Sequence, residues 1–235
     1  MNRRLPWATF ALIAINVVVF AWQFFTHGFD SNQALVDHGA LYGPAVLHGE
    51  WWRIVSGAFE HGGVLHIALN MFALYQVGAF VEFVAGRPRM LAIYFIALLG
   101  SGLAVTFFAP NQITVGASGA IFGLFGALVA IGIRMGQAGR SLIGQTLPII
   151  GINLVLTFTI PTISIAGHVG GLISGFLAGL ALLMMMPRRV QAQEQVEADQ
   201  LAAHPQEALV GAAETRDVHE FAAGDGHEVT EEDAR

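Results

Sequence analysis

The chain has 235 residues, of which 54% are hydrophobic and only 12% are charged. Ordinary soluble proteins carry about 25% charged residues, so the composition favours an integral membrane protein. The absence of cysteine excludes disulfides, thiol catalysis and cysteine-ligated metals. The net charge of −6 comes from residues 187–235, where twelve acids face four arginines, while residues 1–186 carry five acids and seven arginines. No basic patch indicates a nucleic-acid partner.

Six apolar runs are long enough to cross a bilayer, since about 30 Å of hydrocarbon takes roughly 20 residues of helix. They predict an all-α membrane domain over residues 1–186, with spans at 7–25, 64–84, 90–109, 115–133, 141–160 and 163–186. The first run follows two arginines, as a signal peptide would. It is too long for a typical signal peptide and no small-residue cleavage site follows it, so we expect a retained span.

The arginines predict the orientation of the spans. They precede the first run, separate the second from the third and the fourth from the fifth, and follow the sixth. With six spans all of these positions fall on one side, and only Arg53 falls on the other side within residues 1–186. The positive-inside rule therefore predicts a multi-pass protein of the cell membrane (plasma or bacterial inner), with both termini cytoplasmic.

Two segments lie outside the regular pattern of spans. The first external loop, residues 26–63, contains "GEWWRIVSGAFEHGG", and its Trp51, Trp52 and Arg53 suit the membrane–water interface. We expect this loop to lie partly in the outer leaflet. Residues 187–235 are acidic and poor in apolar side chains, which predicts a mostly disordered cytoplasmic tail.

Four polar side chains from three expected spans share one layer of the membrane. His66 and Asn70 lie on the second span, Ser118 on the fourth and His168 on the sixth. All three spans enter from the outer side, so at 1.5 Å per residue these side chains fall within roughly 10 Å of the outer face. Each alone has an ordinary structural explanation in helix packing. Their convergence at one depth favours a functional site, because polar groups are costly in hydrocarbon.

Glycines predict that the fourth and sixth spans touch. Small residues recur at helical spacing along both runs, at Gly116, Gly119, Gly123 and Gly126 and at Gly167, Gly171, Gly175 and Gly179. Such stripes let helix backbones approach closely. A short serine on one span and a histidine on the other can hydrogen-bond only under that condition.

The chemistry that these side chains indicate is acyl transfer. A serine hydroxyl needs a nearby base, and His168 is the only histidine in the last three spans. Spans three to six contain no Asp or Glu, so the pattern predicts a Ser118–His168 dyad without a carboxylate. The backbone N–H of Ser118, the Asn70 amide and His66 are candidate donors to an oxyanion. Such a site requires no metal and no cofactor.

The chain resembles the rhomboid family of intramembrane serine proteases over residues 1–186. The resemblance rests on "GASGAIFG", "AGHVGGLISG", "HGGVLHIALN" and "EWWR", in that family's positions on a six-span chain. It implies a six-helix bundle whose first loop is membrane-embedded and whose fifth span, with the following loop, forms a lateral gate. It implies Ser118 as nucleophile, His168 as general base and acid, and oxyanion stabilisation by His66 and Asn70. Supporting roles fall to Gly116, Phe122, Trp52 and Arg53.

The expected substrates are transmembrane proteins, cleaved near the extracytoplasmic face. Two alternatives stay open at this point. A catalytically silent rhomboid-like protein would bind membrane helices without cleaving them, and such relatives are expected to lack the serine or the histidine. An intramembrane metalloprotease or metal transporter using His61, His66 and His168 is disfavoured, because no HExxH motif is present.

Overall fold

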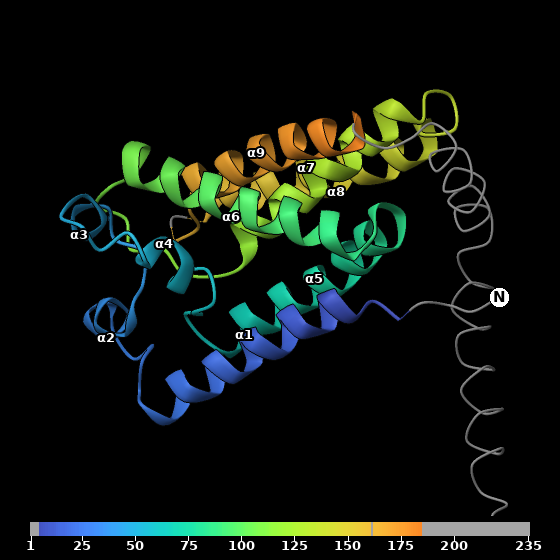
Figure 1. Ribbon diagram of the computed structural model, residues 1–235. Coiled ribbons are helices and arrows are strands. Elements are labelled where there is room, and N and C mark those ends of the chain that lie inside the picture. The colour runs from blue at the N-terminus through green and yellow to red at the C-terminus, as the bar shows by residue number, and fades with distance from the viewer. Residues whose placement is uncertain (1–4, 161, 185–235) are drawn as a thin grey trace, which may run out of the picture.

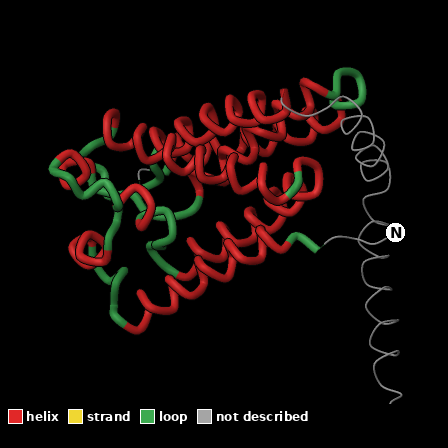
Figure 2. The backbone as a smooth tube through the Cα atoms, in the orientation of Figure 1, coloured by secondary structure: helices red, strands yellow, loops and turns green. Residues whose placement is uncertain are grey.

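The computed structural model describes residues 5–160 and 162–184, which form helices and connecting loops without a strand (Figures 1 and 2). The helices in this part of the chain are α1 (Trp7–Phe25), α2 (Asn32–His38), α3 (Gly43–Leu47), α4 (Arg53–Ser56), α5 (Val64–Ala85), α6 (Arg87–Phe108), α7 (Ser118–Arg134), α8 (Arg140–Thr159) and α9 (Ile165–Met184). Five of them (α1, α5, α6, α8 and α9) are long and apolar enough to cross a membrane. The expectation of an all-helical, multi-pass membrane protein is confirmed.

The helix of the expected fourth span begins later than the apolar run does. The helix begins at Ser118 and not at residue 115, because Gly116 has a φ of 112°, which no helix interior accommodates. α7 is apolar but has 17 residues, fewer than the five long helices. The third span also begins earlier than predicted, at Arg87 with Pro88 in its first turn. The predicted tail, residues 187–235, lies outside the described residues.

α7 is the central helix of the bundle, and thirteen of its 17 residues are buried. Its glycines meet those of α9 so closely that side chains have no room between the two backbones. A Cβ added to Gly171 would collide with the carbonyl of Gly119, and one added to Gly175 would collide with Gly123. The predicted contact between the fourth and sixth spans is therefore present, and glycine is what permits it.

Polar contacts fasten α1 to α5, beside which it runs in Figure 1. The Glu82 carboxylate on α5 accepts hydrogen bonds from the backbone N–H groups of Ala8 (3.1 Å) and Thr9 (2.8 Å), and from the Thr9 hydroxyl (2.9 Å). These N–H groups lie in the first turn of α1, where no carbonyl of the helix itself is available. Near the other end of α1, the side-chain oxygen of Gln23 accepts from the backbone N–H of His61 at 2.9 Å.

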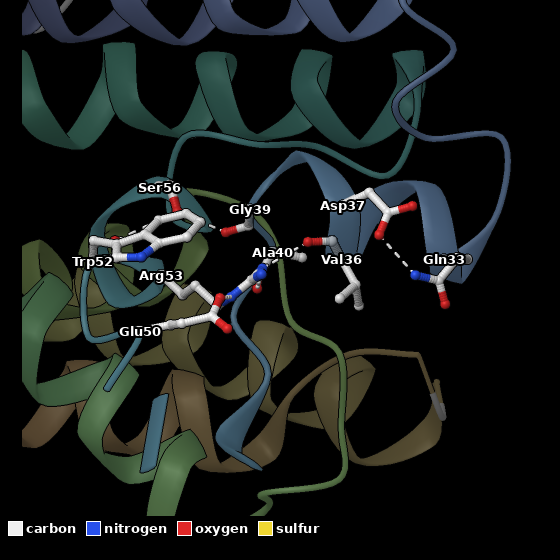
Figure 3. A network of polar contacts seen from close by, with 9 residues as sticks. All are labelled: Gln33, Val36, Asp37, Gly39, Ala40, Glu50, Trp52, Arg53 and Ser56. Atoms are coloured by element: carbon white, nitrogen blue, oxygen red, sulfur yellow. Dashed lines mark hydrogen bonds and ion pairs between the residues drawn. The ribbon is translucent and has the colours of Figure 1, made fainter. Parts of the chain in front are cut away.

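The loop between α1 and α5 is built from α2, α3 and α4, which gather at one end of the bundle (Figure 1). Arg53 organises this loop, as Figure 3 shows. Its guanidinium donates to the carbonyls of Val36 (2.6 Å) and Ala40 (3.2 Å), pairs with the Glu50 carboxylate (2.6 Å) and lies over the Trp52 ring at 4.7 Å. Arg53 is buried because these acceptors replace its water.

The same loop holds the segment that precedes α7. Leu41 and Thr114 exchange two backbone hydrogen bonds, of 3.0 and 2.9 Å, as an isolated antiparallel bridge. The N–H of Gly116 donates to the carbonyl of Gly57 at 2.9 Å, directly after α4. The position at which α7 begins is thus set by the loop that Arg53 organises.

Candidate active site

Ser118 and His168 lie side by side where α7 and α9 touch. The Nε2 atom of His168 is 2.9 Å from the Oγ of Ser118. Ser118 is the first residue of α7, so its backbone N–H has no acceptor within its own helix. The hydroxyl is half-buried, whereas His168 is buried in the first turn of α9.

Phe122 holds the plane of the His168 ring. It lies one turn after Ser118 on α7, and the two rings stack with centroids 4.1 Å apart and planes 17° from parallel. Phe122 is itself buried, so the imidazole is confined on this face. Such stacking restricts the side-chain rotation that would otherwise break the contact between Nε2 and the serine.

His66 faces the turn that precedes Ser118. A Cβ on Gly116 would lie only 2.8 Å from the Nε2 of His66, so glycine is required both for this contact and for the backbone angle. The Nδ1 of His66 accepts the backbone N–H of Gly62 at 3.3 Å. A neutral imidazole that accepts at Nδ1 carries its hydrogen on Nε2, and that N–H therefore points towards the turn.

Asn70 is one turn further along α5, on the same side of the helix. Its Nδ2 donates one hydrogen to the carbonyl of His66 at 2.9 Å and lies 3.9 Å from the position of a Cβ on Gly116. The second hydrogen of this amide remains available. The structure therefore brings His66 and Asn70 together at Gly116, in the turn that precedes Ser118.

Trp52 and Arg53 do not join this group of side chains. Their contacts are with the loop: Arg53 with Val36, Ala40 and Glu50, and Trp52 with Arg53. The loop that they belong to contacts the segment before α7 through backbone hydrogen bonds of Leu41 and Gly57. Among the described residues, neither side chain has a hydrogen bond or ring contact with Ser118 or His168.

One contact of the site has no counterpart in the sequence analysis. Thr157, near the end of α8, places its Oγ1 2.7 Å from the Nδ1 of His168. The residue is 2% exposed. A threonine in an apolar helix gives no signal of its own, because its hydroxyl normally bonds the carbonyl one turn earlier; here it does that too, with Asn153 at 2.7 Å.

Two titratable groups of the loop lie buried next to α5. Burial raises the pKa of Glu60 from its ordinary 4.5 to about 8, although the positive charge of Arg53 acts in the opposite direction. Burial, together with the neighbouring His66, lowers the pKa of His61 to about 3. The His61 ring meets that of His66 edge to face, with centroids 5.1 Å apart. At neutral pH both Glu60 and His61 are therefore uncharged.

The described residues hold no group of three or more histidine, aspartate or glutamate side chains placed to bind a metal ion. Of the three candidate metal-binding histidines, His61 and His66 are neighbours, while His168 contacts Ser118 and Thr157.

Fold and site together define a class: a multi-pass helical membrane protein with a serine and a histidine paired between two closely packed helices. The family model for the Rhomboid domain matches residues 48–185, which is more than half of the chain. The chain therefore belongs to the rhomboid family.

Several relatives are similar to this chain. It is 37% identical over 178 residues to "Rhomboid protease GluP" of Bacillus subtilis, a match that covers 75% of this chain and 35% of that protein. It is 34% identical over 158 residues to "RHOMBOID-like protein 6, mitochondrial" of Arabidopsis thaliana, covering 66% and 51%. A 28% match to "Putative rhomboid protease YdcA" of B. subtilis covers 80% and 94%. The chain thus spans about a third of GluP and half of the Arabidopsis protein.

Proposed function

We propose that this protein is an intramembrane serine endopeptidase that cleaves transmembrane proteins through a Ser118–His168 dyad. The observation that carries the proposal is the 2.9 Å contact between His168 Nε2 and Ser118 Oγ. Family membership supports the same class of reaction, since the relative GluP is named a rhomboid protease.

In the proposed reaction, the Ser118 oxygen attacks the peptide carbonyl carbon while its proton passes to Nε2 of His168. The carbon–nitrogen bond then breaks, and the leaving amine takes the proton from Nε2. Water attacks the resulting ester, again giving a proton to His168, and Ser118 regains its hydrogen as the acid product leaves. No metal or cofactor takes part in these steps.

The negative charge that develops on the carbonyl oxygen requires donors already in place. Three N–H groups border the turn at Gly116: the backbone N–H of Ser118, the Nε2–H of His66 and the free hydrogen of the Asn70 amide. The first of these also lies at the positive end of the α7 dipole. They supply the oxyanion hole of the proposed reaction.

The proposed orientation places both termini in the cytoplasm and the site in the outer half of the membrane. The support is the distribution of arginines over the connections between helices. In this arrangement α7 crosses the membrane as a sixth span, enclosed by the longer helices around it. The substrate class that fits is a membrane protein cut near its extracytoplasmic end.

The test uses the full chain in liposomes with a single-span reporter substrate and a fluorophosphonate probe. We expect cleavage and labelling by the wild type, and loss of both in Ser118→Ala and in His168→Ala. Ser141→Ala is the matched control, because the Ser141 hydroxyl contacts only Gln145 among the described residues. Cleavage should survive a chelator.

Normal cleavage by Ser118→Ala would disprove the dyad. A wild-type protein that binds reporter helices but neither cleaves nor labels would instead match the catalytically silent alternative. Activity that a chelator abolishes and zinc restores would favour the alternative of a metal-dependent protease.

A further inference from the structure

His168 has two ring nitrogens, and each contacts a hydroxyl from a different helix. Nε2 is 2.9 Å from Ser118 on α7, and Nδ1 is 2.7 Å from Thr157 on α8. Both His168 and Thr157 are buried, so water does not compete readily for the second contact. The described part of the chain places no carboxylate on this nitrogen, and Thr157 occupies the position instead.

The hydrogen atoms along this chain of contacts have one consistent arrangement. The Thr157 hydroxyl lies 2.7 Å from the carbonyl oxygen of Asn153, a group that can only accept. The single hydroxyl hydrogen must lie between these two oxygens, since without it two lone pairs would face each other at close range. Thr157 Oγ1 therefore accepts from Nδ1–H, and Nε2 presents its lone pair to the Ser118 hydroxyl.

We propose that Thr157 is a positioning residue, which fixes His168 in the tautomer that can take the serine proton. The inference rests on the function proposed above. As the proton moves from Ser118 Oγ to Nε2, the Nδ1–H bond to Thr157 stays in place and orients the ring. Phe122 restricts the ring on one face, and Thr157 fixes its direction within the plane.

Thr146, a second buried threonine on α8, provides the matched control. Its hydroxyl donates to the carbonyl one turn earlier, that of Leu142, at 2.8 Å, just as Thr157 donates to Asn153. Thr146 is 3% exposed. Among the described residues, the Thr157 hydroxyl also contacts another helix, through His168, whereas the Thr146 hydroxyl bonds only within α8. Replacing each by valine removes the same intrahelical bond and keeps the shape.

The kinetic test compares these variants in the full chain in liposomes. For Thr157→Val we expect roughly tenfold slower fluorophosphonate labelling and a similarly lower kcat, with KM little changed, which is the factor of an ordinary hydrogen bond. Thr157→Ser, which keeps the hydroxyl, should restore most of the rate. Thr146→Val should stay within about twofold of the wild type, because its change in α8 is the same.

A second measurement reports the tautomer whether or not the protein is active. Histidine-selective nitrogen-15 spectra, with His168 assigned by His168→Gln, should show the hydrogen on Nδ1 in the wild type and in Thr146→Val. In Thr157→Val we expect a mixture of the two tautomers.

A Thr157→Val protein that labels like Thr146→Val and keeps the Nδ1–H tautomer would overturn the inference while the dyad stands. If neither wild type nor variants react, the proposed function fails, and the spectra still show whether Thr157 sets the tautomer. If Thr157→Val lowers the thermal midpoint, its slower reaction no longer decides the test. The rate of Thr157→Ser and the tautomer of His168 in the wild type then decide it, because neither measurement uses the valine variant.

Discussion

Asn70 and Asn153 are two amides with one local geometry and different surroundings. Each donates to the carbonyl four residues earlier, His66 at 2.9 Å and Ile149 at 2.8 Å. Only Asn70 is buried and faces the turn at Gly116. The hydrogen bond to the preceding turn is therefore the same in both residues. They differ in the second amide hydrogen, which in Asn70 lies near the turn at Gly116.

Replacing Asn70 by alanine should lower kcat about 100-fold with a small change in KM, because an oxyanion donor acts mainly in the transition state. Steady-state cleavage of the reporter in liposomes measures it. Asn153→Ala loses the matching local bond and should cleave at nearly the wild-type rate. Equal effects of the two substitutions would remove Asn70 from the oxyanion hole.

Glu60 predicts how stability depends on pH. Its pKa is raised to about 8 in the folded protein, mainly by burial, from an ordinary 4.5. The folded state therefore keeps the proton more strongly than the unfolded state, and the stabilisation is complete below about pH 4.5 and lost as the pH rises towards 8. The lowered pKa of His61 acts in the opposite direction below its ordinary value of 6.5, so the fall from Glu60 is exposed above that pH. Glu60→Gln should flatten the fall in the thermal midpoint between about pH 6.5 and 8.

The matched control for that substitution is Asp37→Asn, since Asp37 is exposed and contacts Gln33. It should retain the wild-type slope. A Glu60→Gln variant with an unchanged slope would show that another group is responsible.

The contact between α7 and α9 depends on glycines whose added Cβ would meet backbone. At Gly175 that Cβ would collide with Gly123. Gly175→Ala should therefore lower the thermal midpoint and destabilise the fold by about 1–3 kcal/mol, as overpacking does. At Gly151 on α8 no atom lies within 4 Å of the added Cβ, so Gly151→Ala should leave the midpoint unchanged or raise it. Thermal unfolding in detergent compares them; equal midpoints would contradict the tight contact.

The helices were the part of the fold most accessible from sequence. Long apolar runs predict spans well, because each crossing needs a similar length, and the predicted starts of α1 and α5 coincide with the observed ones. The start of α7 is not predictable in this way, because apolar residues continue through Val115 and the spacing of Gly116 fits a glycine-lined helix face, whereas its φ of 112° places it outside the helix. The short helices α2, α3 and α4 have no comparable signal.

Some residues of the candidate site are predictable from the sequence and one is not. His66, Asn70, Ser118 and His168 stand out because polar groups are rare in apolar runs. Thr157 does not, since threonine is common in such helices and satisfies itself locally. Its second contact depends on where α8 ends relative to α9, which is a property of the three-dimensional arrangement.

At the scale of the whole molecule, the proposed orientation has a direct test. The chain has no cysteine, so single cysteines can be introduced without prior substitutions. We expect a cysteine at the exposed His48 to react with an impermeant maleimide added outside the cell, and one at the exposed Gln137 to react only after the membrane is opened. External labelling of the Gln137 position alone would invert the proposed topology. External labelling of both positions would remove α7 as a sixth span.

The polar ties between α1 and α5 have a consequence for assembly. In hydrocarbon, apolar side chains gain little by preferring one helix over another, because lipid tails are as apolar as leucine. Hydrogen bonds therefore determine which helix α1 packs against. They join Glu82 to Ala8 and Thr9, and Gln23 to His61 in the loop just before α5. They also determine its register, because a shift of one turn would leave the carboxylate and the amide without their partners. Partner choice in this part of the molecule is thus decided by a few hydrogen bonds at the two ends of a helix.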